Sequence, residues 1–192
     1  MAVYKVKNQN IQTSGDGLQA FIEGLGSQRE MGIEILSKYG IHNPQSGQWY
    51  SLEGYLKALE ELEKIIGGTA LYSVGEKIPK NAIFPPEVDS IEKALSTLNI
   101  GFHMNHSLDG KSMMFNPANG TFEGGIGNYI YKQIKEGEAE ITVDNAYPTS
   151  FDEGLIFAVA QRFNTASFVS LVDDQSSRSK GGEKDVYRIQ WF

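Results

Sequence analysis

The stretch that decides the fold class is Asn128–Phe163, NYIYKQIKEGEAEITVDNAYPTSFDEGLIFAVAQRF. Apolar and polar residues alternate over 128–134 and again over 138–144, with a Lys-Glu-Gly turn between the two runs, which predicts a pair of antiparallel strands. From Ser150 onward the apolar spacing changes to three and four, and Ser150–Glu153 has the pattern of a capping box. The stretch therefore predicts a β-hairpin followed by an amphipathic helix.

The same two periods divide the rest of the chain. Helical spacing before residue 100 predicts a helix interrupted between Gly24 and Gly26, a helix capped by Ser51 that stops at Gly67, and a short helix that opens at Ser90. Period two after residue 100 predicts strands over 102–106, 112–115, 128–134, 138–144, 168–173 and 185–192. We therefore expect an α+β fold, with N-terminal helices packed on a twisted antiparallel sheet that has one inserted helix. No repeat or linker divides the chain, so we expect a single domain over 1–192.

Composition and charge narrow the classes of function. The chain has 192 residues, of which 40% are hydrophobic, and carries 17 basic against 24 acidic residues for a net charge of −7. It has no basic cluster interleaved with aromatics, which argues against nucleic acid and anionic membranes as partners. No apolar run is long enough to span a membrane, and residues 1–7 lack the apolar segment of a secretory signal, so we expect a cytoplasmic protein. The absence of cysteine excludes disulfides, thiolate nucleophiles and thiolate metal sites.

The segment His103–His106 is the most suggestive for ligand or metal binding. In a helical turn, two histidines three residues apart come within reach of one ion, whereas in a strand they point to opposite faces. A strand is expected here, and the simpler interpretation is then one surface imidazole and one imidazole held in the core or a pocket. A metal or haem site needs a further ligand, for which His42 or a carboxylate such as Asp144 is available.

The other candidate site residues are aromatic or basic. Tyr129 and Tyr131 share one face of an expected strand, where they either pack in the sheet or line a pocket for a flat apolar ligand. Tyr147 follows the neighbouring strand, and Arg162 flanks the apolar stripe of the inserted helix, where it can hold an anionic group. The predicted pocket is formed by Phe102, His103, His106, Tyr129, Tyr131, Tyr147 and Arg162.

No motif indicates a reaction. The glycines of Gly124–Gly127 fit neither of the two common phosphate-loop spacings, so we expect them to form a tight turn. The sequence has no nucleophile-elbow pattern and no acidic pair in an apolar setting. The run Ser176–Lys184 is typical of an exposed loop between two strands, and we assign no site to it. A non-catalytic protein is the simpler expectation.

Three segments together resemble a family of uncharacterised bacterial proteins: Gly75–Pro86, Ser90–Leu95 running into His103–His106, and Asn145–Ile156. A fourth segment, Gly181–Glu183 followed by Tyr187–Trp191, is similar to the end of 4-vinyl reductase-like domains. Those domains share a fold with haem-based nitric-oxide sensors and Golgi-transport tethering subunits. The resemblance covers about residues 50 to 192.

The resemblance implies an α+β ligand-binding domain, often dimeric and tied to sensing, with a cavity between helices and sheet. This chain departs from the relatives, which carry cysteine near Ser176-Ser177 and again after the Gly-Gly-Glu, where this chain has Lys184-Asp185. The Tyr-x-Ser-x-Arg signature of the haem sensors is also absent, so neither a thiol role nor that haem clamp is carried over.

Our leading hypothesis is a non-catalytic sensory or carrier domain, in a homodimer, that holds a small and largely apolar ligand between sheet and helices. The first alternative is a haem- or metal-binding protein that uses His103 and His106. The second alternative is a dimeric protein–protein interaction module without a ligand. The sequence separates the three poorly, because a pocket wall and a core wall need the same residue types.

Overall fold

The computed structural model describes residues 3–192, the side chain of residue 81 excepted. The elements of the first half are β1 (Ile11–Ser14), α1 (Gly15–Gly24), η1 (Gly26–Gln28), α2 (Arg29–Lys38), β2 (Trp49–Ser51), α3 (Leu52–Ile66), α4 (Gly68–Gly75) and η2 (Ile78–Asn81). They are followed by α5 (Ile91–Ser96), α6 (Leu98–Met104), β3 (His106–Leu108), β4 (Ser112–Met113), β5 (Phe115–Asn116), β6 (Thr121–Phe122), β7 (Tyr129–Lys135) and β8 (Glu138–Val143). The chain closes with α7 (Thr149–Phe163), β9 (Phe168–Leu171), η3 (Arg178–Lys180) and β10 (Asp185–Gln190).

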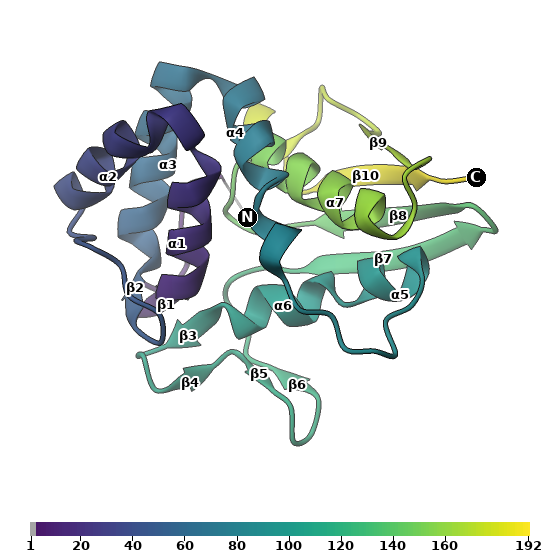
Figure 1. The fold of residues 1–192 in the computed structure, drawn as a ribbon, viewed down its shortest axis with the longest axis horizontal. Helices are drawn as coiled ribbons and strands as arrows, with labels where there is room; N and C mark the ends of the chain where they lie inside the picture. The colour runs from purple at the N-terminus through teal and green to yellow at the C-terminus, as the bar shows by residue number, and fades with distance from the viewer. Residues whose placement is uncertain (1–2) are drawn as a thin grey trace.

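The strands form two main antiparallel sheets and one short hairpin. The C-terminal sheet has the order β7-β8-β10-β9, with Tyr129 opposite Val143 and Val143 opposite Asp185. A smaller sheet has the order β2-β1-β3-β4, and β5 pairs only with β6. Helix α7 covers one face of the C-terminal sheet (Figure 1). Helices packed on antiparallel sheets confirm the predicted α+β class.

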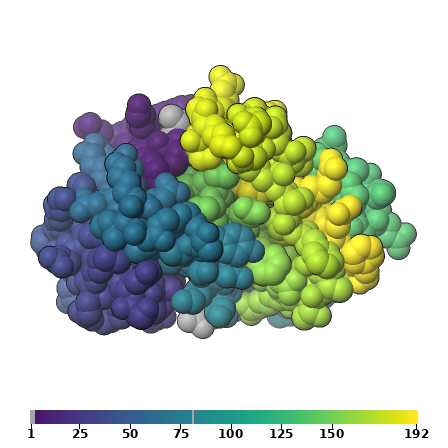
Figure 2. Space-filling view, turned by 90° about the horizontal axis from the view of Figure 1, so that it is seen from above, coloured from purple at the N-terminus to yellow at the C-terminus, as the bar shows by residue number. Residues whose placement is uncertain are grey.

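Two hydrophobic cores lie side by side in the molecule. The first is built by helices α1 to α4 and by Met114, Ile126 and Tyr147, and the second lies between α5, α7 and the inner face of β7, β8 and β10. Figure 2 shows the corresponding halves of the surface, with the N-terminal helices in purple and blue and the C-terminal elements in green and yellow. Phe102 of α6 packs against both cores, so it lies at their junction.

Helices α4 and α7 cross where each has a glycine. A Cβ on Gly75 would lie 2.2 Å from the carbonyl oxygen of Phe151, and a Cβ on Gly154 would lie 2.1 Å from that of Tyr72. Real Cβ atoms do not approach oxygen so closely, and the two backbones therefore touch directly. This contact fixes the helical half of the molecule against the half that carries the C-terminal sheet.

Several predicted elements agree with the structure. The interruption at Gly24 and Gly26, the Ser51 cap and the Ser90 cap are confirmed, because both serine side chains accept a hydrogen bond from the first turn of their helices. Helix α3 ends at Gly67, whose φ of 76° suits glycine. The predicted strands after residue 128 are also confirmed, with ends that differ by one to a few residues.

The predicted strand over 102–106 is wrong, because α6 continues to Met104 and β3 begins only at His106. Phe102, Met104 and His106 alternate with polar or small residues as in a strand, and this alternation hid the helical spacing of Leu98 and Phe102. The run 112–115 is also not one strand, since β4 and β5 are separated at Met114.

The predicted capping box of α7 is wrong as well. The helix begins at Thr149 with Pro148 as its N-cap residue, and Ser150 lies inside the first turn with no hydrogen-bond partner for its hydroxyl.

Among the described residues, no helix is long and apolar enough to cross a membrane.

Candidate functional site

Helix α6 and the first residue of β3 place two imidazoles close to Phe102. His103 and His106 are 1% and 2% exposed. The Nδ1 atom of His103 lies 2.9 Å from the carbonyl oxygen of Asn99, and that of His106 lies 2.7 Å from the carbonyl oxygen of Phe102. Since a carbonyl oxygen only accepts, Nδ1 carries the proton in both rings and Nε2 is left as the acceptor in the neutral form.

His106 uses both of its nitrogens within the fold. Its Nε2 lies 2.9 Å from the hydroxyl oxygen of Tyr147, which donates to it. Burial lowers the pKa of His106 to about 4, so the ring is neutral at physiological pH. No lone pair of this imidazole is available to a metal or ligand unless the hydrogen bond to Tyr147 breaks.

His103 differs from His106 in having one unused nitrogen. Its Nδ1–H donates to Asn99, while Nε2 has no hydrogen-bond partner among the described residues. The ring stands edge-on to Phe102 at 5.4 Å and to Phe122 at 4.8 Å between centroids. Burial lowers the pKa of His103, which keeps the lone pair of Nε2 free of a proton at neutral pH.

Further aromatic rings pack against Phe102 beside α6. The Phe102 centroid lies 4.6 Å from His106, 5.2 Å from Tyr129 and 5.9 Å from Tyr147. We call Phe102, His103, His106, Tyr129 and Tyr147 the aromatic junction. The structure thus brings together five of the seven predicted pocket residues.

The remaining two predicted residues lie elsewhere. The hydroxyl of Tyr131 donates to Gln133 on the same strand. The Nη1 atom of Arg162 donates to the carbonyl oxygens of Pro79, at 3.0 Å, and Ala82, at 2.7 Å, and the guanidinium lies 5.0 Å from the centroid of the Phe84 ring. Arg162 therefore holds the connection before α5 against α7.

The additional metal ligands considered from the sequence do not join the two imidazoles. The carboxylate of Asp144 accepts a hydrogen bond from the backbone N–H of Asn128, at 2.6 Å, and His42 lies exposed in the loop after α2. Within residues 3–192 as described, no group of three or more histidines and carboxylates is arranged to hold a metal ion.

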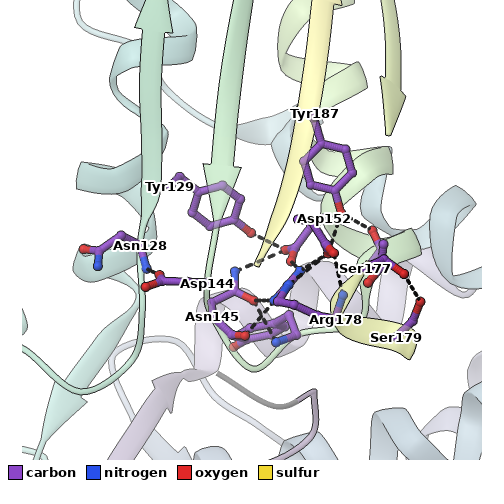
Figure 3. Close-up of polar contacts among 12 residues, drawn as sticks. Asn128, Tyr129, Asp144, Asn145, Asp152, Ser177, Arg178, Ser179 and Tyr187 are labelled. Carbon is purple, nitrogen blue, oxygen red and sulfur yellow. Dashed lines mark hydrogen bonds and ion pairs between the residues drawn. The ribbon is translucent and has the colours of Figure 1, made fainter. Parts of the chain in front are cut away.

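A second buried polar cluster surrounds Arg178 (Figure 3). Its Nη2 lies 2.6 Å from Asp152 and 2.7 Å from Asp185, and its Nε donates to Asp185 at 2.9 Å. Its Nη1 donates to the carbonyl and side-chain oxygens of Asn145, both at 2.6 Å. The guanidinium and both carboxylates are fully buried, and we call these four residues the arginine cluster.

The arginine cluster has a structural role and is not arranged to bind a ligand. Its guanidinium donates to oxygens on three residues, which leaves no donor directed at a ligand. Burial lowers the pKa of Arg178, but the carboxylates of Asp152 and Asp185 raise it by more. Burial raises the pKa of Asp152, against the lowering effect of the guanidinium.

The expectation of a simple exposed loop over 176–184 is therefore wrong for Arg178. The available signal was Asp185, which alternates with Tyr187 and Ile189 on the inward face of its strand. A carboxylate at an inward position needs a buried cationic partner, and Arg178 lies close before it in the sequence.

The aromatic junction has no room for a flat ligand between its rings. A planar group fits between two rings only when the rings stand about 7 Å apart, because it needs a van der Waals contact of about 3.5 Å on each side. The centroid distances around Phe102 are shorter than this. Two hollows lie elsewhere: one of about 290 Å³ beside Tyr4, Glu63 and Thr149, and one of about 330 Å³ beside Val172 and Val186.

Comparison with known proteins identifies the fold. No family model matches the sequence, and no curated protein matches it. An H-NOX protein from S. oneidensis in the Fe(II) state, carrying three substitutions, is similar with a TM-score of 0.63 and 13% identity over 93% of this chain and 96% of that chain. An oxygen-binding H-NOX domain related to soluble guanylate cyclases is similar with a TM-score of 0.59 and 14% identity, over 93% of this chain and 94% of that chain.

This chain has the H-NOX fold. The likeness confirms the expectation that the fold is the one found in haem-based nitric-oxide sensors. It is a likeness of structure alone at these identities. The finer resemblance to 4-vinyl reductase-like domains stays a prediction, as does the homodimer.

Proposed function

We propose that this chain is a non-catalytic sensory domain that binds a flat, largely apolar ligand of the haem type through Nε2 of His103. The observation that carries the proposal is the unused nitrogen of His103, fixed in direction by Asn99, in a chain with the H-NOX fold. One similar structure was solved to study how porphyrin distortion modulates the redox potential of a haem, and another is of an H-NOX protein in an Fe(II) ligation state.

The donor group fits an iron centre. Histidines that ligate metals commonly donate their other ring N–H to a backbone carbonyl or a carboxylate, which fixes the tautomer and the ring orientation. His103 has this arrangement, whereas His106 does not, because its second nitrogen accepts from Tyr147. A bound haem supplies an iron centre that takes a small gas molecule as its further ligand.

The residues around His103 have simple roles in this proposal. Asn99 orients the imidazole, and Phe102 forms the apolar wall on one side of it. Tyr129 and Tyr147 pack behind Phe102 and keep water away from that wall. Because the rings on this side are closely packed, the ligand has to approach His103 from the side of Phe122.

The test is the haem content of two variants compared with the unchanged chain. Protein purified from cells supplied with a haem precursor, or mixed with haemin, should show a Soret band and bound iron. His103→Gly should lose the band and regain it on addition of imidazole, which restores a donor without restoring the side chain. His42→Ala, which removes an exposed histidine, should keep the band, and far-UV circular dichroism should show that all three chains are folded.

Two outcomes would contradict the proposal. If folded His103→Gly keeps its Soret band, His103 is not the ligand. If the unchanged chain takes up no haemin, the haem-type ligand is refuted, and the same samples in light scattering then test the remaining hypothesis of a dimeric interaction module.

A further inference from the structure

One of the two aromatic rings in edge contact with His103 reaches the surface of the molecule. The residue is 1% exposed, yet Phe122, whose ring lies 4.8 Å from the imidazole, is itself 43% exposed. The ring of Phe122 therefore packs on the imidazole with one side and faces solvent with the other. On the other side, Phe102 and the rest of the aromatic junction lie within the core.

Phe122 belongs to a short hairpin that projects from the body of the molecule beneath α6 (Figure 1). Strands β5 and β6 are joined by two residue pairs only, Phe115 with Phe122 and Asn116 with Thr121. The rings of Phe115 and Phe122 pack on each other at 5.1 Å, and the turn closes through its own asparagine side chains. The hairpin is thus held together mainly by internal contacts.

The hairpin is anchored at its base rather than along its length. Met114 donates its N–H to the carbonyl oxygens of His103 and His106, and Glu123 donates to the carbonyl oxygen of Met114. Met114 is buried, whereas both strands of the hairpin are exposed or half-buried. A movement of residues 115–122 about this base leaves the anchoring hydrogen bonds in place.

The residues that follow the hairpin permit such a movement. A Cβ on Gly124 would meet no atom within 4 Å, and Gly125 has a φ of 117°, a conformation that residues with side chains rarely adopt. Gly124, with open space around it at the end of the hairpin, is able to absorb the backbone rotation of a hinge.

We propose that residues 115–122 form a lid over His103, and that a flat apolar ligand reaches Nε2 of His103 only when this lid lifts and carries the ring of Phe122 away. The proposal rests on the proposed function for the nature of the ligand. The position of the cover and of its hinge depends only on the contacts of Phe122, Met114 and Gly124.

The first test needs no ligand. Diethyl pyrocarbonate modifies accessible neutral imidazoles, and the chain has three histidines that mass spectrometry can follow separately. Phe122→Ala should raise the modification rate of His103 about fivefold, the rate equivalent of one aromatic ring contact. The rates at exposed His42 and at buried His106 should not change. Phe168→Ala, which removes an exposed ring from β9, is the matched control and should leave all three rates unchanged.

The second test measures haemin association by stopped flow. Phe122→Ala should bind about fivefold faster than the unchanged chain, and Phe168→Ala at the unchanged rate. The lid is refuted if Phe122→Ala leaves both the modification of His103 and the association rate unaltered. If His103→Gly still binds haemin while Phe122→Ala speeds modification of His103, the lid stands and the proposed ligand role of His103 fails.

Discussion

Removing the guanidinium of Arg178 tests whether the arginine cluster has a structural role. Arg178→Met leaves two carboxylates, Asp152 and Asp185, in an interior from which water is excluded. Breaking a buried ion pair by removing one partner typically costs about 3–5 kcal/mol. Small domains have about 5–15 kcal/mol of stability in total, so we expect a folded but weakened protein at pH 7.

The loss should depend on pH with a definite sign. Burial already raises the pKa of Asp152, and the variant lacks the cation that lowers it, so the pKa in the folded state rises further above its unfolded value. The folded variant then binds more protons than the unfolded chain, and its stability falls as pH rises. Lowering the pH from 7 to 5 should therefore return part of the lost stability, by at most about 1.4 kcal/mol per pH unit for one carboxyl group.

Urea unfolding followed by tryptophan fluorescence measures both effects, because Trp191 is buried in the second core. With a slope of about 2 kcal/mol per molar urea, the midpoint should fall by about 2 M at pH 7. Arg188→Met is the control, since Arg188 is 43% exposed and pairs with Glu140 on the open face of the sheet, where such pairs contribute at most about 1 kcal/mol. Equal shifts in the two variants would refute the structural role of the arginine cluster.

Two further predictions concern His106 and the helix crossing. Burial lowers the pKa of His106 to about 4 in the folded state, against about 6.5 in the unfolded chain. The free energy of unfolding should therefore fall by about 3 kcal/mol in total as the pH drops from 6.5 to 4. A urea midpoint that does not change across this range would contradict the burial of a neutral ring. Gly154→Ala should lower the free energy of unfolding by more than about 1 kcal/mol, because its Cβ would overlap the backbone of α4, whereas Gly101→Ala, with open space around it in α6, should raise stability by about 0.5–1 kcal/mol. Thermal unfolding of both glycine variants checks this, and a Gly154→Ala protein as stable as the unchanged chain would contradict the close approach of α4 and α7.

Elements specified by local signals were predictable from the sequence. Ser51 at the start of α3 and Gly67 at its end determine the bounds of the helix through contacts with residues close in sequence. The alternation in β7, β8 and β10 is equally local, because each strand has one face on a core and one toward solvent. Strands β1 and β2 were missed because four and three residues are too few to show a period.

The members of the aromatic junction could be named from the sequence, but the geometry of the junction could not. The aromatic and imidazole residues were selected for their chemistry, and four of them do meet at the fifth, Phe102. Which histidine keeps a free nitrogen depends on Tyr147, which lies 41 residues from His106 in the sequence, so no local pattern encodes it. The arginine cluster depends in the same way on Asn145 and Arg178, which are 33 residues apart.

The composition of the arginine cluster also bears on synthesis of the chain. Asn145 lies just before α7 and Asp152 in its first turns, whereas Arg178 and Asp185 come from the last 15 residues of the sequence. During translation, α7 can form against α4 well before those residues leave the ribosome, but Asp152 then lacks its cation. A buried, unpaired carboxylate opposes closure of the second core. The second core should therefore close only when β9 and β10 join the sheet and Arg178 pairs with Asp152.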